Sequence, residues 1–176
     1  MYFKESNDFL TSENKKFINE KILGNEFPYF KNPTLATSTD KSVFLTHVLL
    51  IRPEKRLYKE HINSIYYLDC LEIIKSFFKK FKIKHKEMLR LCVNYTYNNG
   101  SNKCLVHQDH EFSHKQLIIY LNDTDKSSKT IILDKNNKVL KKITPEKNKG
   151  VCFDNKPHYH FYPKQGERIV LVATFR

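Results

Sequence analysis

Residues 88–97, MLRLCVNYTY, decide the fold class of this chain. The stretch alternates and is rich in residues that favour β-strands. Segments of the same character follow at short intervals, separated by turn residues such as Asn, Asp, Pro and Gly. These segments span residues 115–122, 129–133, 138–143, 150–153, 158–162 and 168–175. Many short strands closed by turns predict a mainly β protein with a jelly-roll or barrel core rather than a parallel α/β sheet.

The first half of the chain predicts two helices that support this β region, with one more strand between them. Thr11 precedes apolar residues at helical spacing, and Gly24 offers a stop. Residues 25–41 are polar and contain prolines, so we expect them to form a loop. Residues 42–51 form an apolar run typical of a strand buried on both faces. Residues 59–81 carry a wide apolar stripe typical of a helix packed on a sheet.

Length and composition point to a single folded domain. The chain has 176 residues, of which 40% are hydrophobic and 13% aromatic, enough for one core. Its net charge of +12 can indicate a nucleic-acid or other anionic partner. The lysines, however, are spread along the chain instead of forming a focused patch, and the abundance of Lys, Asn, Ile, Phe and Tyr also fits a biased composition. Nucleic acid is therefore not the expected partner.

Cysteine usage and the shortness of the apolar runs predict a soluble, cytoplasmic protein. No two cysteines form a C-x-x-C pair, which fits a reduced intracellular compartment. The first residues lack the apolar segment of a secretory signal, and the longest apolar runs are too short to cross a bilayer, so we expect no membrane partner. The four cysteines are Cys70, Cys92, Cys104 and Cys152.

A candidate metal site begins at His107-Gln108-Asp109. Positions i and i+2 of a strand point to the same side, so the imidazole and the carboxylate could reach one ion. Alone this triplet is weak, and it also fits a surface loop. Two histidines and one carboxylate hold the iron of non-haem oxygenases and leave open positions around it. His158 and His160 both lie in a late strand, and either could supply the third ligand.

The segment that follows resembles the prolyl-4-hydroxylase-like branch of the 2-oxoglutarate/Fe(II) dioxygenases. In that branch the distal histidine is followed by a G-x-R or G-x-K motif, whose basic residue pairs with the far carboxylate of the cosubstrate. Residues 166–168 read Gly-Glu-Arg, and Arg168 follows His158 by ten positions, the separation typical of the branch. His160 would give a separation of eight. The resemblance therefore selects His158 as the third metal ligand.

Three more motifs carry the same resemblance, which runs from residue 88 to residue 176. Residues 117–122, LIIYLN, resemble a family strand whose tyrosine, here Tyr120, donates a hydrogen bond to the far carboxylate. Residues 97–100, YNNG, resemble a Y-x-x-G motif whose tyrosine, here Tyr97, lines the cosubstrate pocket. Residues 150–154, GVCFD, resemble the strand before the distal histidine. Two departures concern the substrate side: SSKT at 127–130 replaces G-G-x-T, and Cys104 replaces a tyrosine.

The resemblance implies a fold and a division of the chain. The fold would be mainly β, a double-stranded β-helix (jelly-roll) core packed on one or two N-terminal helices. Residues 1–176 would form a single oxygenase domain, in which 1–85 provide helical and strand support and 86–176 form the core that carries the site. His107, Asp109 and His158 would hold the metal, with no catalytic residue beyond these ligands. Three residues would bind the cosubstrate: Arg168, Tyr120 and Tyr97.

The resemblance also implies the chemistry. The cofactors would be Fe(II), 2-oxoglutarate and O₂, with ascorbate as a reductant. Oxidative decarboxylation to succinate and CO₂ would accompany hydroxylation of a prolyl or other amino-acid side chain, free or in a protein. One alternative is an AlkB-type nucleic-acid dealkylase, although residues 168–176, RIVLVATFR, lack the R-x-N-x-T-x-R run of that group. Another is a non-catalytic cupin-like metal-binding module.

Overall fold

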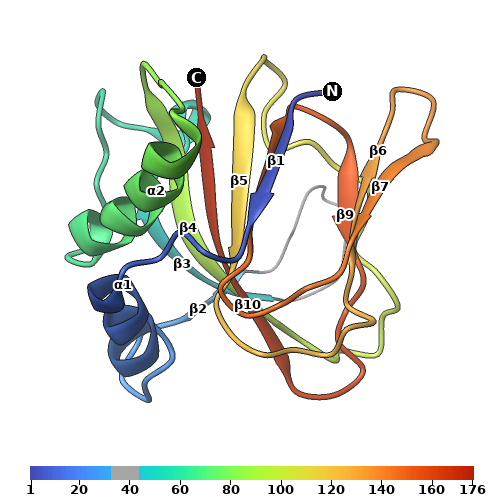
Figure 1. The fold of residues 1–176 in the computed structure, drawn as a ribbon, viewed down its shortest axis with the longest axis horizontal. Helices are drawn as coiled ribbons and strands as arrows, with labels where there is room; N and C mark the ends of the chain where they lie inside the picture. Colours follow the sequence, from blue (N-terminus) through green and yellow to red (C-terminus); the bar gives the residue numbers. More distant parts are fainter. Residues whose placement is uncertain (33–43) are drawn as a thin grey trace.

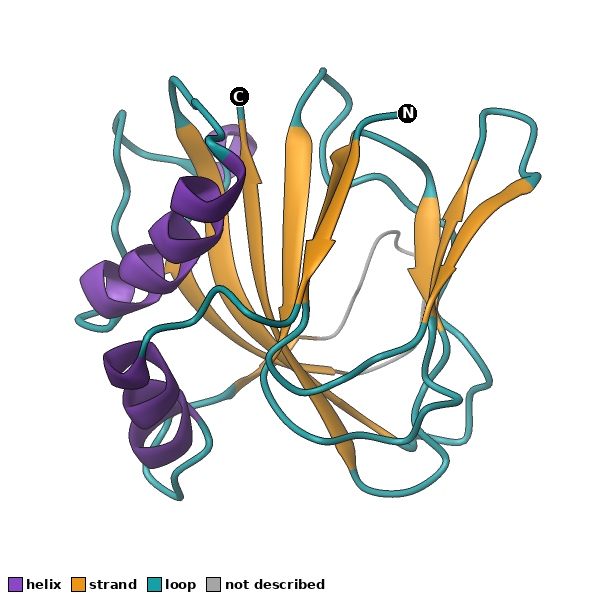
Figure 2. Cartoon of the chain, viewed as in Figure 1, coloured by secondary structure: helices purple, strands orange, loops and turns teal. Residues whose placement is uncertain are grey.

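Two antiparallel sheets face each other, and helices cover the outer side of the larger one (Figures 1 and 2). The computed structural model describes residues 1–32 and 44–176. Its strands are Phe3–Ser6 (β1), Phe30–Asn32 (β2), Phe44–Leu50 (β3), Met88–Tyr97 (β4), Lys115–Tyr120 (β5), Thr130–Leu133 (β6), Val139–Ile143 (β7), Gly150–Asp154 (β8), His158–His160 (β9) and Glu167–Phe175 (β10). The strand order is β1-β8-β5-β10-β4-β3-β2 in the large sheet and β7-β6-β9 in the small sheet. This arrangement confirms the predicted jelly-roll class, mainly β with supporting helices.

Strand β5 shows how one apolar run serves two cores. Leu117 and Ile119 pack in the core between the large sheet and the helices, whereas Ile118 and Tyr120 pack in the core between the two sheets. Successive side chains of a strand point to opposite faces, so a strand covered on both sides is apolar at every position. The site described below lies in the second of these layers, between the sheets.

The long helix is shorter than the apolar stripe predicts. Helix α2 spans Tyr67–Phe81, so the expected start at residue 59 is wrong. Upstream of the helix the backbone extends the edge of β3: Ile51 N–H donates to His61 O at 3.0 Å, and Asn63 N–H donates to Leu49 O at 2.9 Å. These sheet-like hydrogen bonds satisfy backbone groups that a helix would otherwise use internally, and they delay the first helical turn.

The first predicted helix is confirmed, together with its cap. The Thr11 hydroxyl accepts from the Asn14 backbone N–H, and the Asn14 side chain accepts from the Thr11 N–H, a reciprocal capping box. Helix α1 (Ser12–Phe17) then continues into a π-helical segment, η1 (Ile18–Ile22). The chain also contains a short 3₁₀ turn, η2 (Pro53–Lys55).

Two short strands escaped the sequence analysis. Strand β1 pairs with β8, and β2, inside the expected loop, pairs with β3. Runs of four and three residues are too short to show a periodicity of their own. Residues 33–41 of that loop, and residues 42 and 43 of the strand predicted at 42–51, lie outside the described residues.

All four cysteines are free and buried. Within the described parts of the chain, no helix combines the length and the apolar character that a bilayer crossing demands.

Gly150 allows β8 to lie against two aromatic rings. A Cβ atom at this position would lie 2.8 Å from the Phe77 ring and 2.9 Å from the Phe9 ring, inside normal contact distance. Gly150→Ala is therefore expected to destabilise the protein by about 1–3 kcal/mol, the usual cost of overpacking. Denaturant unfolding measures the change. The Gly150→Ala/Phe77→Leu variant should lose less free energy of unfolding than the two single changes together, and strict additivity would contradict the overpacking.

Candidate functional site

A narrow cavity of about 50 Å³ lies between the two sheets. The large sheet contributes mainly β4, β5 and β10, and the small sheet contributes β6 and β9. Most of the polar lining residues come from alternate positions of these strands, which point to the same side. The lining residues are Phe44, Arg90, Asn94, Thr96, His107, Asp109, Gln116, Ile118, Thr130, His158, His160, Arg168, Val170 and Val172. Four of the six residues predicted for the site are among them: His107, Asp109, His158 and Arg168.

His107 and His158 face each other across a β-bridge. Their backbones exchange two hydrogen bonds, of 3.0 Å and 2.9 Å, and their ring centroids lie 4.5 Å apart. In each ring Nδ1 lies next to a backbone carbonyl two residues earlier: Leu105 O at 2.9 Å and Lys156 O at 3.0 Å. A carbonyl can only accept, so Nδ1 carries a proton in both rings, and Nε2 has the lone pair in the neutral form of each. This is the tautomer in which a histidine binds a metal through Nε2.

Asp109 is held at one end of this pair by an arginine. Arg90 Nη1 donates to Asp109 Oδ1 at 2.9 Å, and both side chains are largely buried. Burial alone would raise the pKa of Asp109, but the charges of Arg90, His158 and His107 outweigh it and hold the pKa below its usual range. The other carboxylate oxygen, Oδ2, is buried and has no hydrogen-bond partner in the part of the chain that the structure describes. Asp109 is therefore an ionised ligand with one oxygen available.

The protonation of the two histidines differs. Burial opposes protonation of His107, yet contacts with Cys104 and the charge of Asp109 raise its pKa to about 9. Burial and the neighbouring charge of His107 lower the pKa of His158 to about 4. Near neutral pH His107 therefore carries a second proton, on Nε2, whereas His158 is neutral. A metal ion binding to both Nε2 atoms would displace the Nε2 proton of His107, as metal ligands must be deprotonated.

These side chains are of the types that bind a non-haem iron ion. Two imidazoles and one carboxylate are the ligands of such sites, and the unpaired Asp109 Oδ2 is the buried polar atom that an ion would satisfy. Within residues 1–32 and 44–176, no three His, Cys, Asp or Glu side chains already form a closed metal-binding group. In the present arrangement Gln116 Nε2 lies 3.2 Å from His158 Nε2. This amide would have to turn away before a metal could bind.

A buried arginine marks the other end of the cavity. Arg168 is 3% exposed and forms no ion pair with any carboxylate of the described residues. Its Nη2 donates to Thr130 Oγ1 at 3.0 Å, and Tyr120 OH lies 2.7 Å from the same Oγ1. Its Nε has no partner among the residues that the structure describes. The guanidinium also lies over the Tyr120 ring, 5.2 Å from its centroid. A buried charge without a counter-ion is costly, so this group of donors favours a bound carboxylate.

His160 lies between the two ends. In the small sheet His158 pairs with Ile132, whereas His160 pairs with Thr130, the partner of Arg168. The ring Nδ1 of His160 lies 3.2 Å from Cys104 Sγ, and its Nε2 is buried without a partner in the described ranges 1–32 and 44–176. Burial and the charge of Arg168 lower the pKa of His160, so the ring is neutral. This register places His158 beside His107 and His160 toward the arginine.

Two predicted site residues, Tyr97 and Tyr120, do not line the cavity, and Tyr97 lies away from it. It is 37% exposed and follows Thr96, whose side chain is buried and donates to the Arg168 backbone carbonyl at 3.2 Å. Neighbouring residues of a strand point to opposite faces, so β4 turns Tyr97 away from the site. Tyr120, in contrast, reaches the site through Thr130.

Several cavity residues were not assigned to the site from the sequence. Arg90 and Gln116 were given no role, His160 was considered only as an alternative metal ligand, and Thr130 was noted only as part of a departure from the family pattern. One signal was present for Arg90: a charged residue inside an apolar strand that is covered on both faces needs a buried partner.

Arg90→Met is expected to weaken metal binding by roughly tenfold to a hundredfold, as changes to residues that orient metal ligands usually do. The substitution removes the charge that holds Asp109 ionised and aligned. Equilibrium dialysis with Mn(II) measures the affinity without depending on activity. Arg176→Met breaks an exposed ion pair with Glu87 and serves as the matched control. Equal affinities in the two variants would contradict a role for Arg90.

Comparisons with known proteins show which solved structures share this fold. No protein-family profile matches the chain, and no curated protein matches it either. Among solved structures, a 2OG-Fe(II) oxygenase family oxidoreductase from Burkholderia pseudomallei is similar with a TM-score of 0.68 at 10% identity, covering 93% of this chain and 89% of that one. A prolyl hydroxylase from Trichoplax adhaerens, in complex with a hypoxia inducible factor peptide, has a TM-score of 0.65 at 17% identity. The match covers 98% of this chain and 82% of that one. A prolyl-4-hydroxylase from Pseudomonas putida has a TM-score of 0.59 at 12% identity, and the match covers 99% of this chain and 91% of that one. At these identities the likeness is one of fold.

Proposed function

Because the chain has the fold of the 2-oxoglutarate/Fe(II) oxygenases, including prolyl-4-hydroxylases, we propose that it is an Fe(II)- and 2-oxoglutarate-dependent dioxygenase. The reaction would hydroxylate a C–H bond of a prolyl or other amino-acid side chain. One observation carries the proposal: the buried Arg168, which has no carboxylate partner among residues 1–32 and 44–176, shares a cavity with His107, Asp109 and His158. A binding site for an anion beside a set of metal ligands is what a 2-oxo acid bound to iron requires.

The metal ligands would be His107 Nε2, His158 Nε2 and Asp109 Oδ2. The carbonyls of Leu105 and Lys156 fix the two imidazoles, and Arg90 fixes the carboxylate. When bound, iron, O₂ and 2-oxoglutarate would supply the oxidative decarboxylation that yields succinate and CO₂, with ascorbate as the expected reductant. The part of this chain is to orient the ligands and to exclude water from the reacting atoms.

Arg168 would bind the far carboxylate of 2-oxoglutarate. Its planar guanidinium suits a carboxylate, and the hydroxyls of Thr130 and Tyr120 lie beside it as further donors. His160, neutral and with a free Nε2, would lie along the cosubstrate between the carboxylate and the metal. Tyr97, which faces away from the cavity, is left out of the proposed site.

An amino-acid side chain is the proposed substrate, in a peptide or free. Support comes from the Trichoplax adhaerens prolyl hydroxylase, which shares the fold and is described in complex with a peptide fragment. The four free, buried cysteines fit a reduced compartment, and we therefore propose a cytoplasmic enzyme.

The direct test is to incubate the purified protein with Fe(II), ascorbate, 2-oxoglutarate and a panel of proline-containing peptides. Mass spectrometry follows succinate and the gain of one oxygen atom in the peptide. The expected result is succinate formation that depends on 2-oxoglutarate and is lost in His107→Ala. Equal succinate formation in wild type and His107→Ala would contradict the oxygenase proposal and favour a cupin-like binding module. Turnover on methylated oligonucleotides, with none on peptides, would favour a dealkylase.

A further inference from the structure

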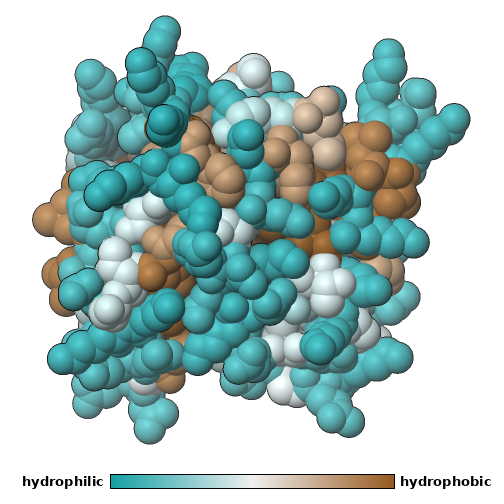
Figure 3. Space-filling model, viewed as in Figure 1, coloured by the Kyte–Doolittle hydropathy of each residue, from teal (hydrophilic) through white to brown (hydrophobic). Residues whose placement is uncertain are grey.

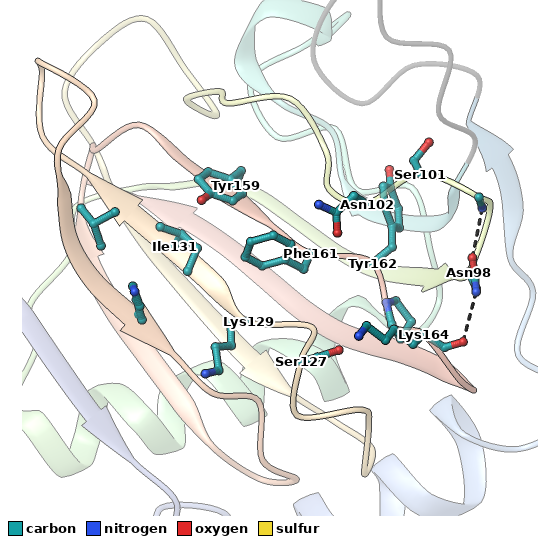
Figure 4. Close-up of a pocket in the computed structure, with 14 residues that line it drawn as sticks. Asn98, Ser101, Asn102, Ser127, Lys129, Ile131, Tyr159, Phe161, Tyr162 and Lys164 are labelled. Carbon is teal, nitrogen blue, oxygen red and sulfur yellow. Dashed lines mark hydrogen bonds between the residues drawn. The ribbon is translucent and has the colours of Figure 1, made fainter.

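A second hollow, of about 690 Å³, lies on the outer face of the small sheet (Figure 4). Strands β6, β7 and β9 form its floor, and the loops at residues 98–102 and 162–164 form its walls. Along β9 the side chains of His158 and His160 point into the cavity between the sheets, whereas Tyr159 points into this groove. The groove and the metal site thus occupy opposite faces of one strand.

The groove is positively charged. Lys129, Lys142 and Lys164 line it, and the Lys103 ammonium lies 4.5 Å from the centroid of the Tyr159 ring at its edge. None of the described residues that line it is acidic. The nearby Asp125 carboxylate is held by backbone N–H groups of Ser127 and Lys164, at 2.8 Å each. The charge of the groove therefore favours an anionic ligand.

Apolar side chains lie between these lysines. Ile131 and Phe161 form part of the floor, as Figure 4 shows, and Val139 at one side is 50% exposed. Apolar atoms also gather on the surface over the β6–β7 hairpin, at the right of the molecule (Figure 3). A ligand that fits this groove carries negative charge and apolar groups together.

An anionic macromolecular ligand could be a nucleic acid or an acidic protein segment, and the geometry of the aromatic rings distinguishes between them. A single-stranded nucleic acid binds by stacking its bases on open aromatic faces. Here the Lys103 ammonium lies over the Tyr159 ring, and Phe161 meets that ring edge to face, at 5.5 Å and 74°. The rings therefore do not form a stacking platform, whereas carboxylates and apolar side chains fit the lysines and the floor.

We propose that this groove is a binding site for an acidic segment of a protein partner, in which Asp or Glu side chains alternate with apolar ones. Carboxylates contact Lys129, Lys142 and Lys164, and an apolar side chain packs on Ile131 and Phe161. The site goes beyond the proposed oxygenase reaction and does not depend on the metal ligands, since it uses the opposite face of β9.

Fluorescence anisotropy with a short labelled peptide of alternating Glu and Leu tests the site on the full chain. Two double variants are compared: Lys129→Glu/Lys142→Glu in the groove, and Lys15→Glu/Lys16→Glu on exposed positions of α1. Both lower the net charge of +12 by the same amount, so that only the location differs. The groove variant is expected to bind at least about tenfold more weakly than wild type, and the α1 variant within about twofold. His107→Ala is expected to bind as wild type does, which separates this site from the oxygenase proposal.

Equal weakening in the two double variants would overturn the proposal, because net charge alone would then explain binding. Loss of peptide binding in His107→Ala would overturn it as a separate site. Displacement of the peptide by an oligothymidylate, but not by unlabelled acidic peptide, would overturn it in favour of nucleic acid. Thermal unfolding midpoints verify that each variant is folded, and Lys129→Gln/Lys142→Gln replaces the groove variant if that one is not.

Discussion

His158→Ala is expected to lose Fe(II)-dependent succinate formation by more than about a hundredfold, since even residues that only orient metal ligands contribute tenfold to a hundredfold. His160→Ala is expected to keep the metal and to raise the KM for 2-oxoglutarate by about tenfold, the value of one hydrogen bond to a charged group. The difference follows from the register of β9, which pairs His158 with His107 and His160 with Thr130. Two observables separate the roles: the affinity for Mn(II), and the division of the loss between kcat and KM.

Both histidines are buried, so the two alanine variants must first be compared by thermal unfolding. Each variant is the matched control for the other, because the two histidines lie two residues apart on one strand and face the same cavity. Retention of Mn(II) binding by His158→Ala together with its loss in His160→Ala would reverse the assignment. The ten-residue separation from Arg168 would then no longer identify the metal ligand.

Arg168→Leu is expected to raise the KM for 2-oxoglutarate by at least about a hundredfold, because it removes the charge from a buried carboxylate site and such pairs are worth 2–5 kcal/mol or more. The kcat at saturating cosubstrate should change far less, since the residue does not contact the reacting atoms. Arg168→Lys retains the charge but loses the planar guanidinium, so its KM for 2-oxoglutarate should lie between those of wild type and Arg168→Leu. Steady-state succinate formation measures all three proteins.

A cosubstrate analogue without the far carboxylate gives this prediction its control. Wild type should discriminate strongly between 2-oxoglutarate and 2-oxobutanoate, and Arg168→Leu should discriminate little. Undiminished discrimination by a folded Arg168→Leu protein would show that another group binds the far carboxylate. The double variant with Thr130→Val would then test the remaining donors.

The strands after residue 86 could be predicted because each is a short β-forming run closed by turn residues. Met88–Tyr97 has the bounds expected from its pattern. The helix before it could not, because the apolar residues between 59 and 66 continue the helical stripe in the sequence but lie on backbone that pairs with β3. Such pairing between distant segments leaves no mark within the stripe itself.

The same limit applies to the site. His107, Asp109, His158 and Arg168 could be brought together because a known spacing relates them. The spacing of Tyr97 to His107 matched as well, yet the direction of its side chain depends on the register of β4 against its neighbours, which spacing does not determine. Arg90 and Gln116 were missed because their importance comes only from the side chains that face them across the sheets.

Strand β9 has an evolutionary consequence. Its outward residue, Tyr159, can be exchanged without touching the inward His158 and His160, so the choice of partner and the chemistry can diverge independently on three consecutive positions. The number of residues in β9, in contrast, cannot change without affecting the site. One residue inserted within β9 would exchange the faces of the residues that follow it and would turn an imidazole away from the cavity. Variants that change partners should therefore arise by substitution in this segment, and insertions there should be eliminated by selection.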